Sequence, residues 1–149
     1  MKKKTMCLIC IVIMLLICIT LYFKPIPLSD IANENNQIKI VLSDLGVRNG
    51  EACIDSVEYQ DITVEQNSAI INLLEKFYYY RNFSTPFSDG SISDLGDKVM
   101  HIYVYADNSL VNRVFMTSSG KITINDKNYT CKKSRQLIEQ IIEILEQAG

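Results

Sequence analysis

His101 is the single histidine of this 149-residue chain, and histidine is the side chain best suited to proton transfer near neutral pH. It lies in the middle of an alternating apolar segment, on the same predicted strand face as Val99, Tyr103 and Tyr105. One histidine cannot form a multi-histidine metal site, and no carboxylate stands near it at ligand spacing. The sequence also indicates no nucleophile or orienting group for it. We therefore expect a packed or surface strand residue and assign no catalytic residue.

Cys53 and Cys131 are the cysteines that follow the N-terminal apolar segment. Each would lie at the end of a predicted strand, and an oxidising compartment would allow them to pair. Such a disulfide would close a long loop and stabilise the fold by about 3–5 kcal/mol. The alternative is two separate thiols that pack as small apolar side chains. Both possibilities remain open at this stage.

Aromatic residues form the third group of interest. Three consecutive tyrosines begin at Tyr78, close to a long polar loop at 82–97. Tyrosine supplies a large contact area at low entropic cost, which favours a recognition surface. The alternative is that some of these rings pack on the sheet or cover its edge. The candidate binding surface consists of Tyr78, Tyr79, Tyr80, Phe83, Phe87, His101, Tyr103 and Tyr105.

Other chemical motifs are missing from the sequence. It contains no Ser-x-x-Lys, Gly-x-Ser-x-Gly, His-Glu-x-x-His or P-loop pattern. Asp89, Asp94 and Asp97 lack the spacing of a calcium-binding loop. We therefore expect neither a metal nor a cofactor.

The N-terminal segment predicts where the chain is located. Lys2, Lys3 and Lys4 precede an uncharged run from Met6 to Phe23, which would rise about 27 Å as a helix. The lysines favour a cytoplasmic N-terminus, a single pass through the cell membrane and an extracytoplasmic C-terminal domain. The lipid bilayer would then be a partner of this helix. Cleavage as a signal peptide and lipidation at Cys18 are the alternatives to a retained anchor.

The rest of the chain is acidic, because it keeps all 17 acids and loses three of the 15 basic residues. An acidic domain argues against nucleic acid as a partner. We divide the chain into a signal-anchor (1–23), a polar linker (24–36) and one domain (37–149), whose length suits a single core.

Periodicity within the domain predicts two strands, a helix, four strands and a final helix. The first helix starts at a capping box, Thr63 to Gln66, and extends to about Arg81. The final helix begins with Ser134 as N-cap. The predicted strands are 37–42, 53–59, 98–106, 110–117, 121–124 and 128–131, with turns at 107–109 and 125–127. This order indicates an α+β fold, in which an N-terminal transmembrane helix is followed by an antiparallel sheet with two helices packed on one face.

The layout resembles the small membrane-tethered extracytoplasmic domains of unknown function found in Gram-positive bacteria. The likeness lies in the segment 54–59 before a capped helix, the hairpin at 107–109, and a strand, polar turn and tyrosine at 121–129 before the last helix. It covers about residues 37–147. The resemblance implies a location and a fold and transfers no site.

From these observations we expect a membrane-anchored, non-enzymatic binding or sensing module. It would bind a protein, a peptide or an envelope component through the 82–97 loop and the neighbouring aromatic residues. The alternative is a small cell-envelope hydrolase or hydrolase inhibitor.

Overall fold

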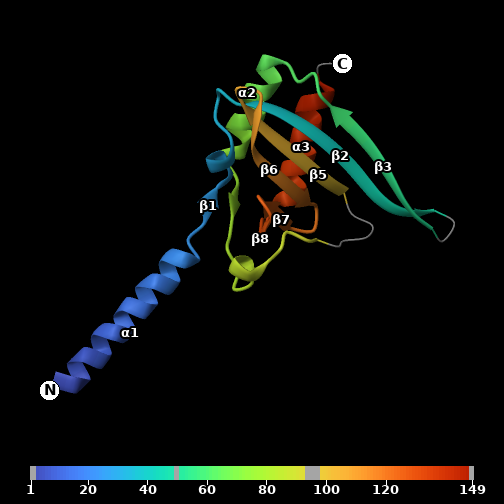
Figure 1. The fold of residues 1–149 in the computed structure, drawn as a ribbon. Coiled ribbons are helices and arrows are strands. Elements are labelled where there is room, and N and C mark those ends of the chain that lie inside the picture. Colours follow the sequence, from blue (N-terminus) through green and yellow to red (C-terminus); the bar gives the residue numbers. More distant parts are fainter. Residues whose placement is uncertain (1–2, 49–50, 93–97, 148–149) are drawn as a thin grey trace.

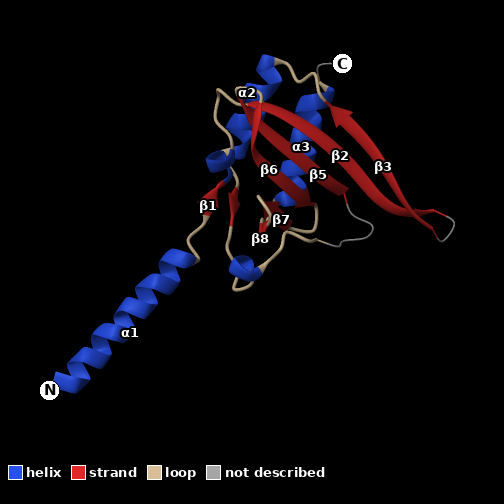
Figure 2. Ribbon diagram, viewed as in Figure 1, coloured by secondary structure: helices blue, strands red, loops and turns tan. Residues whose placement is uncertain are grey.

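The computed structural model describes residues 3–48, 51–92 and 98–147, and it shows an α+β protein with an antiparallel sheet (Figures 1 and 2). The α-helices are α1 (Lys3–Tyr22), α2 (Val64–Leu74) and α3 (Ser134–Glu146). Two short 3₁₀ helices are η1 (Leu28–Ile31) and η2 (Thr85–Phe87). The predicted order of strands and helices in the domain is confirmed, except that the short strand β4 (Tyr78–Tyr79) and η2 lie between α2 and the next long strand.

Six strands form the main sheet in the order β3-β2-β5-β6-β7-β8, and every neighbouring pair is antiparallel. The strands are β2 (Gln37–Arg48), β3 (Glu51–Tyr59), β5 (Lys98–Ala106), β6 (Ser109–Thr117), β7 (Lys121–Ile124) and β8 (Lys127–Thr130). A separate two-stranded pair consists of β1 (Ile26–Pro27) and β4 (Tyr78–Tyr79).

The two faces of the sheet differ because side chains alternate along each strand. One face carries fully buried apolar residues that join α2 and α3 in a single core. The other face carries Lys39, Val41, His101, Tyr103 and Phe115, and none of the helices α1 to α3 contributes to a core on that side. We call it the helix-free face. The core residues of the sheet include Ile38, Ile40, Met100, Ile102, Val104, Val114, Met116, Ile122 and Ile124.

Two tight hairpins fix the register of β5 with β6 and of β7 with β8. Asp107 and Asn108 have φ values of 49° and 64°, and Asn125 and Asp126 have φ values of 46° and 63°. Consecutive positive φ values are the signature of a type I′ turn, whose twist matches that of the paired strands. Both turns fall where the sequence predicted them, and the following strand starts one residue earlier than expected in each case.

The capping box of α2 is confirmed. The backbone N–H of Gln66 donates to the Thr63 hydroxyl at 3.2 Å, and the Thr63 N–H donates to the Gln66 side chain at 2.9 Å. The predicted end of this helix at Arg81 is wrong, because α2 ends at Leu74. The β-forming tyrosines pair instead with β1 and with Thr130.

The N-cap of α3 also differs from the prediction. Lys133 occupies the N-cap position, and Ser134 is the first helical residue. Its buried hydroxyl has no hydrogen-bond partner within the part of the chain that the structure describes.

The N-terminal helix requires a correction. Among the described residues, no helix combines the length and the apolar character needed to cross a membrane. This finding contradicts the predicted single-pass anchor and the cell-membrane localisation, with its assignment of the two ends of the chain, that was derived from it.

Part of the segment 24–36, which was predicted to be a linker, packs into the core of the domain. Leu28 is fully buried, and Ile31 and Ala32 are almost so, all within the main core. The Leu28 N–H donates to the Phe77 carbonyl at 2.9 Å. The apolar residues of this segment therefore pack into the core, although no periodicity in the sequence indicated this.

Candidate functional site

The eight residues of the predicted binding surface are not brought together. His101, Tyr103 and Tyr105 lie along β5, on the helix-free face. Tyr79 is buried and packs edge-on against Tyr129, at 4.9 Å between ring centroids. The others belong to separate surfaces, described below.

Two of these surfaces lie near the end of α1 and near the start of α3. Phe83 and Phe87 are more than 80% exposed, and Phe83 contacts Phe23 edge-on at 4.8 Å. Tyr78 and Tyr80 border a hollow of about 240 Å³. Three lysines share that hollow, and the Lys132 ammonium lies 5.2 Å from the Tyr80 ring.

A pocket of about 300 Å³ on the helix-free face does contain two predicted residues, His101 and Tyr103. The strand register places His101 beside Phe115, and Tyr103 beside Arg113. The His101 ring stacks near that of Tyr103 at 6.2 Å and meets Phe115 edge-on at 4.6 Å. These rings form an aromatic floor. The other residues lining the pocket are Gly90, Ile92, Arg113, Thr123 and Asp126.

Residues 80–92 cross over the β7–β8 end of the sheet, and we call this segment the strap. At its start, Tyr80 and Thr130 exchange two backbone hydrogen bonds of 2.8 and 3.0 Å. Further along, the Thr85 hydroxyl donates to the Asn128 carbonyl at 2.7 Å, and the Asn128 N–H donates to the Ser88 hydroxyl at 2.8 Å. The strap is thus fixed to the edge strand β8.

The last part of the strap forms one wall of the pocket. The Thr123 hydroxyl donates to the Gly90 carbonyl at 3.2 Å, and the Asn128 amide donates to the Ser91 carbonyl at 3.2 Å. Asp89 accepts from the Ser91 hydroxyl and N–H, which lowers the pKa of its carboxyl group. Ile92, which follows these hydrogen-bonded residues directly, also lines the pocket.

Charges border the pocket on one side. The Arg113 guanidinium forms an ion pair with the Asp126 carboxylate, and both side chains are more than half exposed. Burial lowers the pKa of His101 below its ordinary value of 6.5, and Arg113 lowers it further. The floor is therefore uncharged at neutral pH, while its border carries one charge of each sign.

The pocket geometry does not form a nucleophile–base pair from Thr123 and His101. Phe115 stands between them in the register, so they are two strands apart, or about 10 Å. The Thr123 hydroxyl is also within hydrogen-bond distance of the Gly90 carbonyl and the Asn128 side chain. Across the described ranges, no group of three histidine, cysteine or acidic residues could hold a metal ion.

Cys53 and Cys131 are both free thiols, so the proposed disulfide is not formed. Cys53 belongs to β3 at one edge of the sheet, whereas Cys131 follows β8 at the other edge. Five strand spacings separate the edges, which is roughly 20 Å or more, and a disulfide requires Cα atoms within about 7 Å.

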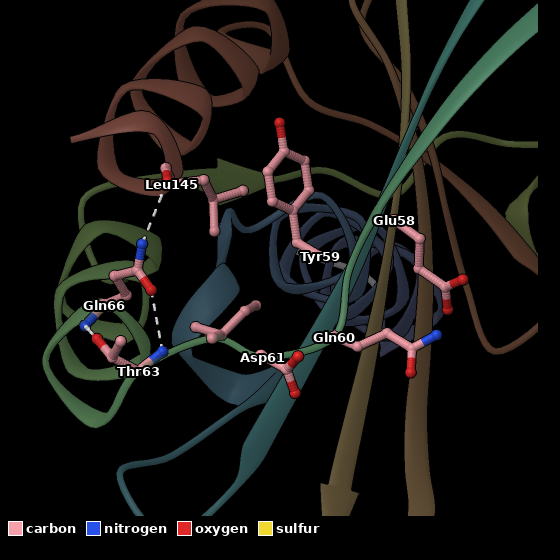
Figure 3. A pocket seen from close by; sticks show the side chains of 8 residues that line it. Glu58, Tyr59, Gln60, Asp61, Thr63, Gln66 and Leu145 are labelled. Atoms are coloured by element: carbon pink, nitrogen blue, oxygen red, sulfur yellow. Dashed lines mark hydrogen bonds between the residues drawn. The ribbon is translucent and has the colours of Figure 1, made fainter. Parts of the chain in front are cut away.

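A second pocket, of about 320 Å³, opens where β3 ends and α2 begins (Figure 3). Tyr59 and Leu145 lie between β3 and α3, and Glu58 points to the opposite side of the strand. The Gln66 amide donates to the carbonyls of Ile144 and Leu145 at 3.2 and 3.3 Å. This pocket also contains Gln60, Asp61, Ile62 and Thr63.

Most residues that line the His101 pocket were not predicted from the sequence as site residues. Arg113, Phe115 and Thr123 were assigned to strands without a role, although their alternation with the core residues does indicate that they share a face with His101. Gly90 and Ile92 carried no such signal, because only the hydrogen bonds of the strap bring them there.

No protein-family model, no curated protein and no solved structure matches this chain.

Proposed function

We propose that this protein is a binding module that holds a segment of a protein or peptide on the helix-free face of its sheet. An apolar or aromatic side chain of the partner would enter the pocket between Ile92 and the aromatic floor. Polar groups of the partner backbone would meet Arg113 and Asp126 at the border. The observation that carries this proposal is the 300 Å³ pocket itself, which joins the strap to the aromatic floor.

The chemistry of the pocket favours binding over turnover. Phe115, Tyr103 and a neutral His101 offer apolar ring surface. Binding sites typically combine such surface with a few polar groups that fix the ligand's orientation. The hydrogen bonds of the strap hold the wall in place before binding, which reduces the ordering cost of association.

Selection from a random peptide library, with the full chain as the target, would test this proposal. We expect the enriched peptides to share an aromatic or large aliphatic residue. Tyr103→Ala should weaken their binding by about tenfold, because it removes part of the floor. Tyr103→Phe keeps the ring and should stay within about threefold of the original affinity.

Tyr78→Ala is the matched control, because Tyr78 belongs to the separate lysine-containing hollow. Its affinity should equal that of the unmodified chain. Denaturation curves would establish that each variant is folded. Equal affinities for Tyr103→Ala and the unmodified chain would exclude this pocket as the binding site.

A further inference from the structure

The two edge strands of the main sheet, β8 and β3, differ in whether another segment covers them. The strap covers β8, through the hydrogen bonds of Tyr80 with Thr130 and of Ser88 with Asn128. β3 lies at the other edge and pairs with β2 alone among the strands that the structure describes. Alternate residues of an edge strand direct unpaired N–H and C=O groups outward.

Of the features that usually prevent an edge strand from pairing, β3 has charged side chains alone, and all of these are acidic. It is nine residues long and contains no proline and no lysine. Its register with β2 runs without a bulge from Tyr59 to Glu51. Ile54 and Val57 are 67% and 53% exposed, and they lie on opposite faces of the strand. Such a long, regular and partly apolar edge is a template for a further strand.

The hairpin of β2 and β3 also extends beyond its neighbour (Figure 1). Pairing of β2 with β5 ends at Asp44, whereas pairing with β3 continues to Arg48. An incoming strand could therefore follow β3 along its whole length, including the part that projects past β5.

Charge identifies the kind of strand that fits. From Glu51 to Glu65 the sequence contains five acids and no basic residue. Glu51, Glu58 and Asp61 are exposed. A second copy of β3 would bring acids opposite acids, which is unfavourable across a strand pair. A strand with lysine or arginine side chains would place opposite charges together.

The pocket at the end of β3 extends this edge. Glu58 and Asp61 line it together with Tyr59 (Figure 3). A peptide that extends beyond the C-terminal end of β3 would enter the pocket and could place one basic side chain near Asp61, while Glu58, on the opposite side of the strand, adds to the negative charge of this edge.

We propose that the outer edge of β3 binds a basic, extended segment of another protein as an added antiparallel strand, with one basic side chain in the pocket at the strand's end. Backbone hydrogen bonds would supply the affinity, and alternate side chains would supply the specificity. This edge lies on the other side of β2 from the His101 pocket, so the inference goes beyond the proposed function.

The test uses the full chain and a synthetic peptide of about ten alternating lysine and valine residues. Binding should slow hydrogen exchange at β3 amides and shift their NMR signals. The same peptide with glutamate in place of lysine should bind at least about tenfold more weakly, and so should one N-methylated at alternate amides.

Val57→Lys and Val111→Lys form a matched pair, because both valines are about half exposed and only Val57 lies on the edge strand. Val57→Lys should abolish binding, and Val111→Lys should leave it unchanged. The Tyr103→Ala variant should also bind the lysine peptide normally, which separates this inference from the proposed function.

Three results would overturn the inference. One is the absence of any effect on β3 amides at saturating peptide. Another is equal binding by Val57→Lys and Val111→Lys. The third is concentration-dependent self-association through β3, which would identify a second copy of the chain as the occupant.

Discussion

Gly90 lies directly against the backbone of Asp126. A Cβ atom at Gly90 would be 2.8 Å from the Asp126 Cα and 3.2 Å from its carbonyl carbon, and the Gly90 φ of +83° already disfavours any other residue. This contact joins the wall of the His101 pocket to the turn that carries its ion pair. Glycine at this position therefore determines how closely the strap approaches the sheet.

Gly90→Ala should displace the strap, because the new methyl group meets backbone atoms that cannot rotate away. We expect a loss of about 1–3 kcal/mol in the free energy of unfolding. Urea denaturation measures this loss, and faster hydrogen exchange at Asn128 would locate it. Gly46→Ala is the control, since its Cβ would meet only the Cys53 sulfur, at an ordinary 3.6 Å. Equal effects of the two changes would contradict the close approach.

Gln66 joins the start of α2 to the end of α3, and its two roles can be separated. Gln66→Glu keeps an oxygen that accepts from the Thr63 N–H but cannot donate to Ile144 and Leu145. Gln66→Glu should lower the free energy of unfolding by about 1 kcal/mol. Gln66→Ala removes both the cap and the bonds to α3, so it should lower the free energy of unfolding by more. Thr63→Ala removes the hydroxyl cap alone. Thermal or urea denaturation would rank the three variants. A Gln66→Glu loss as large as that of Gln66→Ala would show that the hydrogen bond from the Thr63 N–H to the Gln66 side chain contributes nothing, and no loss for Gln66→Glu would show the same for the bonds to α3.

Local signals predicted the central part of the fold. The alternation of apolar and polar residues over 98–117, together with the Asp and Asn pairs that accept positive φ, was sufficient to predict the two hairpins. The capping box at Thr63 located the start of α2. These features depend on neighbours in the sequence. Tyr78 to Tyr80 were assigned to a helix, since Tyr78 continued its apolar stripe, whereas pairing with Ile26, Pro27 and Thr130 gives them an extended conformation.

The candidate pocket depends on contacts that are distant in the sequence. His101, Tyr103 and Phe115 share a face that alternation could indicate. Gly90 reaches Asp126 only through the side-chain hydrogen bonds of the strap, and no periodicity encodes such bonds. The segment 82–97 was predicted to be a binding loop. Its part up to residue 92 belongs to the strap, which is fixed to the sheet and whose last residues form the pocket wall, and residues 93–97 lie outside the described ranges.

His101 should make stability depend on pH in a defined direction. Its folded-state pKa lies below the ordinary value of 6.5, so between these two values the unfolded chain binds a proton that the folded chain does not. The free energy of unfolding should therefore fall as the pH decreases through 6.5, and it should level off below the folded-state pKa. Above pH 6.5 the residue should contribute no pH dependence.

The measurement compares the unmodified chain with His101→Gln between about pH 5 and 8, so that shared carboxylate effects cancel. The difference between the two curves should show the predicted fall. NMR titration of the single histidine gives its pKa directly, and Arg113→Gln should raise that pKa while leaving it below 6.5, because burial is the larger cause. A folded-state pKa above 6.5 would contradict the buried, uncharged floor.

Cys131 should be protected from thiol reagents in the folded chain. Its side chain is fully buried, and burial raises the pKa of its thiol, which reduces the reactive thiolate. Its modification by iodoacetamide should therefore require unfolding, whereas the half-buried Cys53 should react sooner. Mass spectrometry of peptides from a non-reduced digest would follow both thiols. A peptide linking Cys53 to Cys131 would contradict the sheet order, because a bond between those residues requires the β3 and β8 edges to meet.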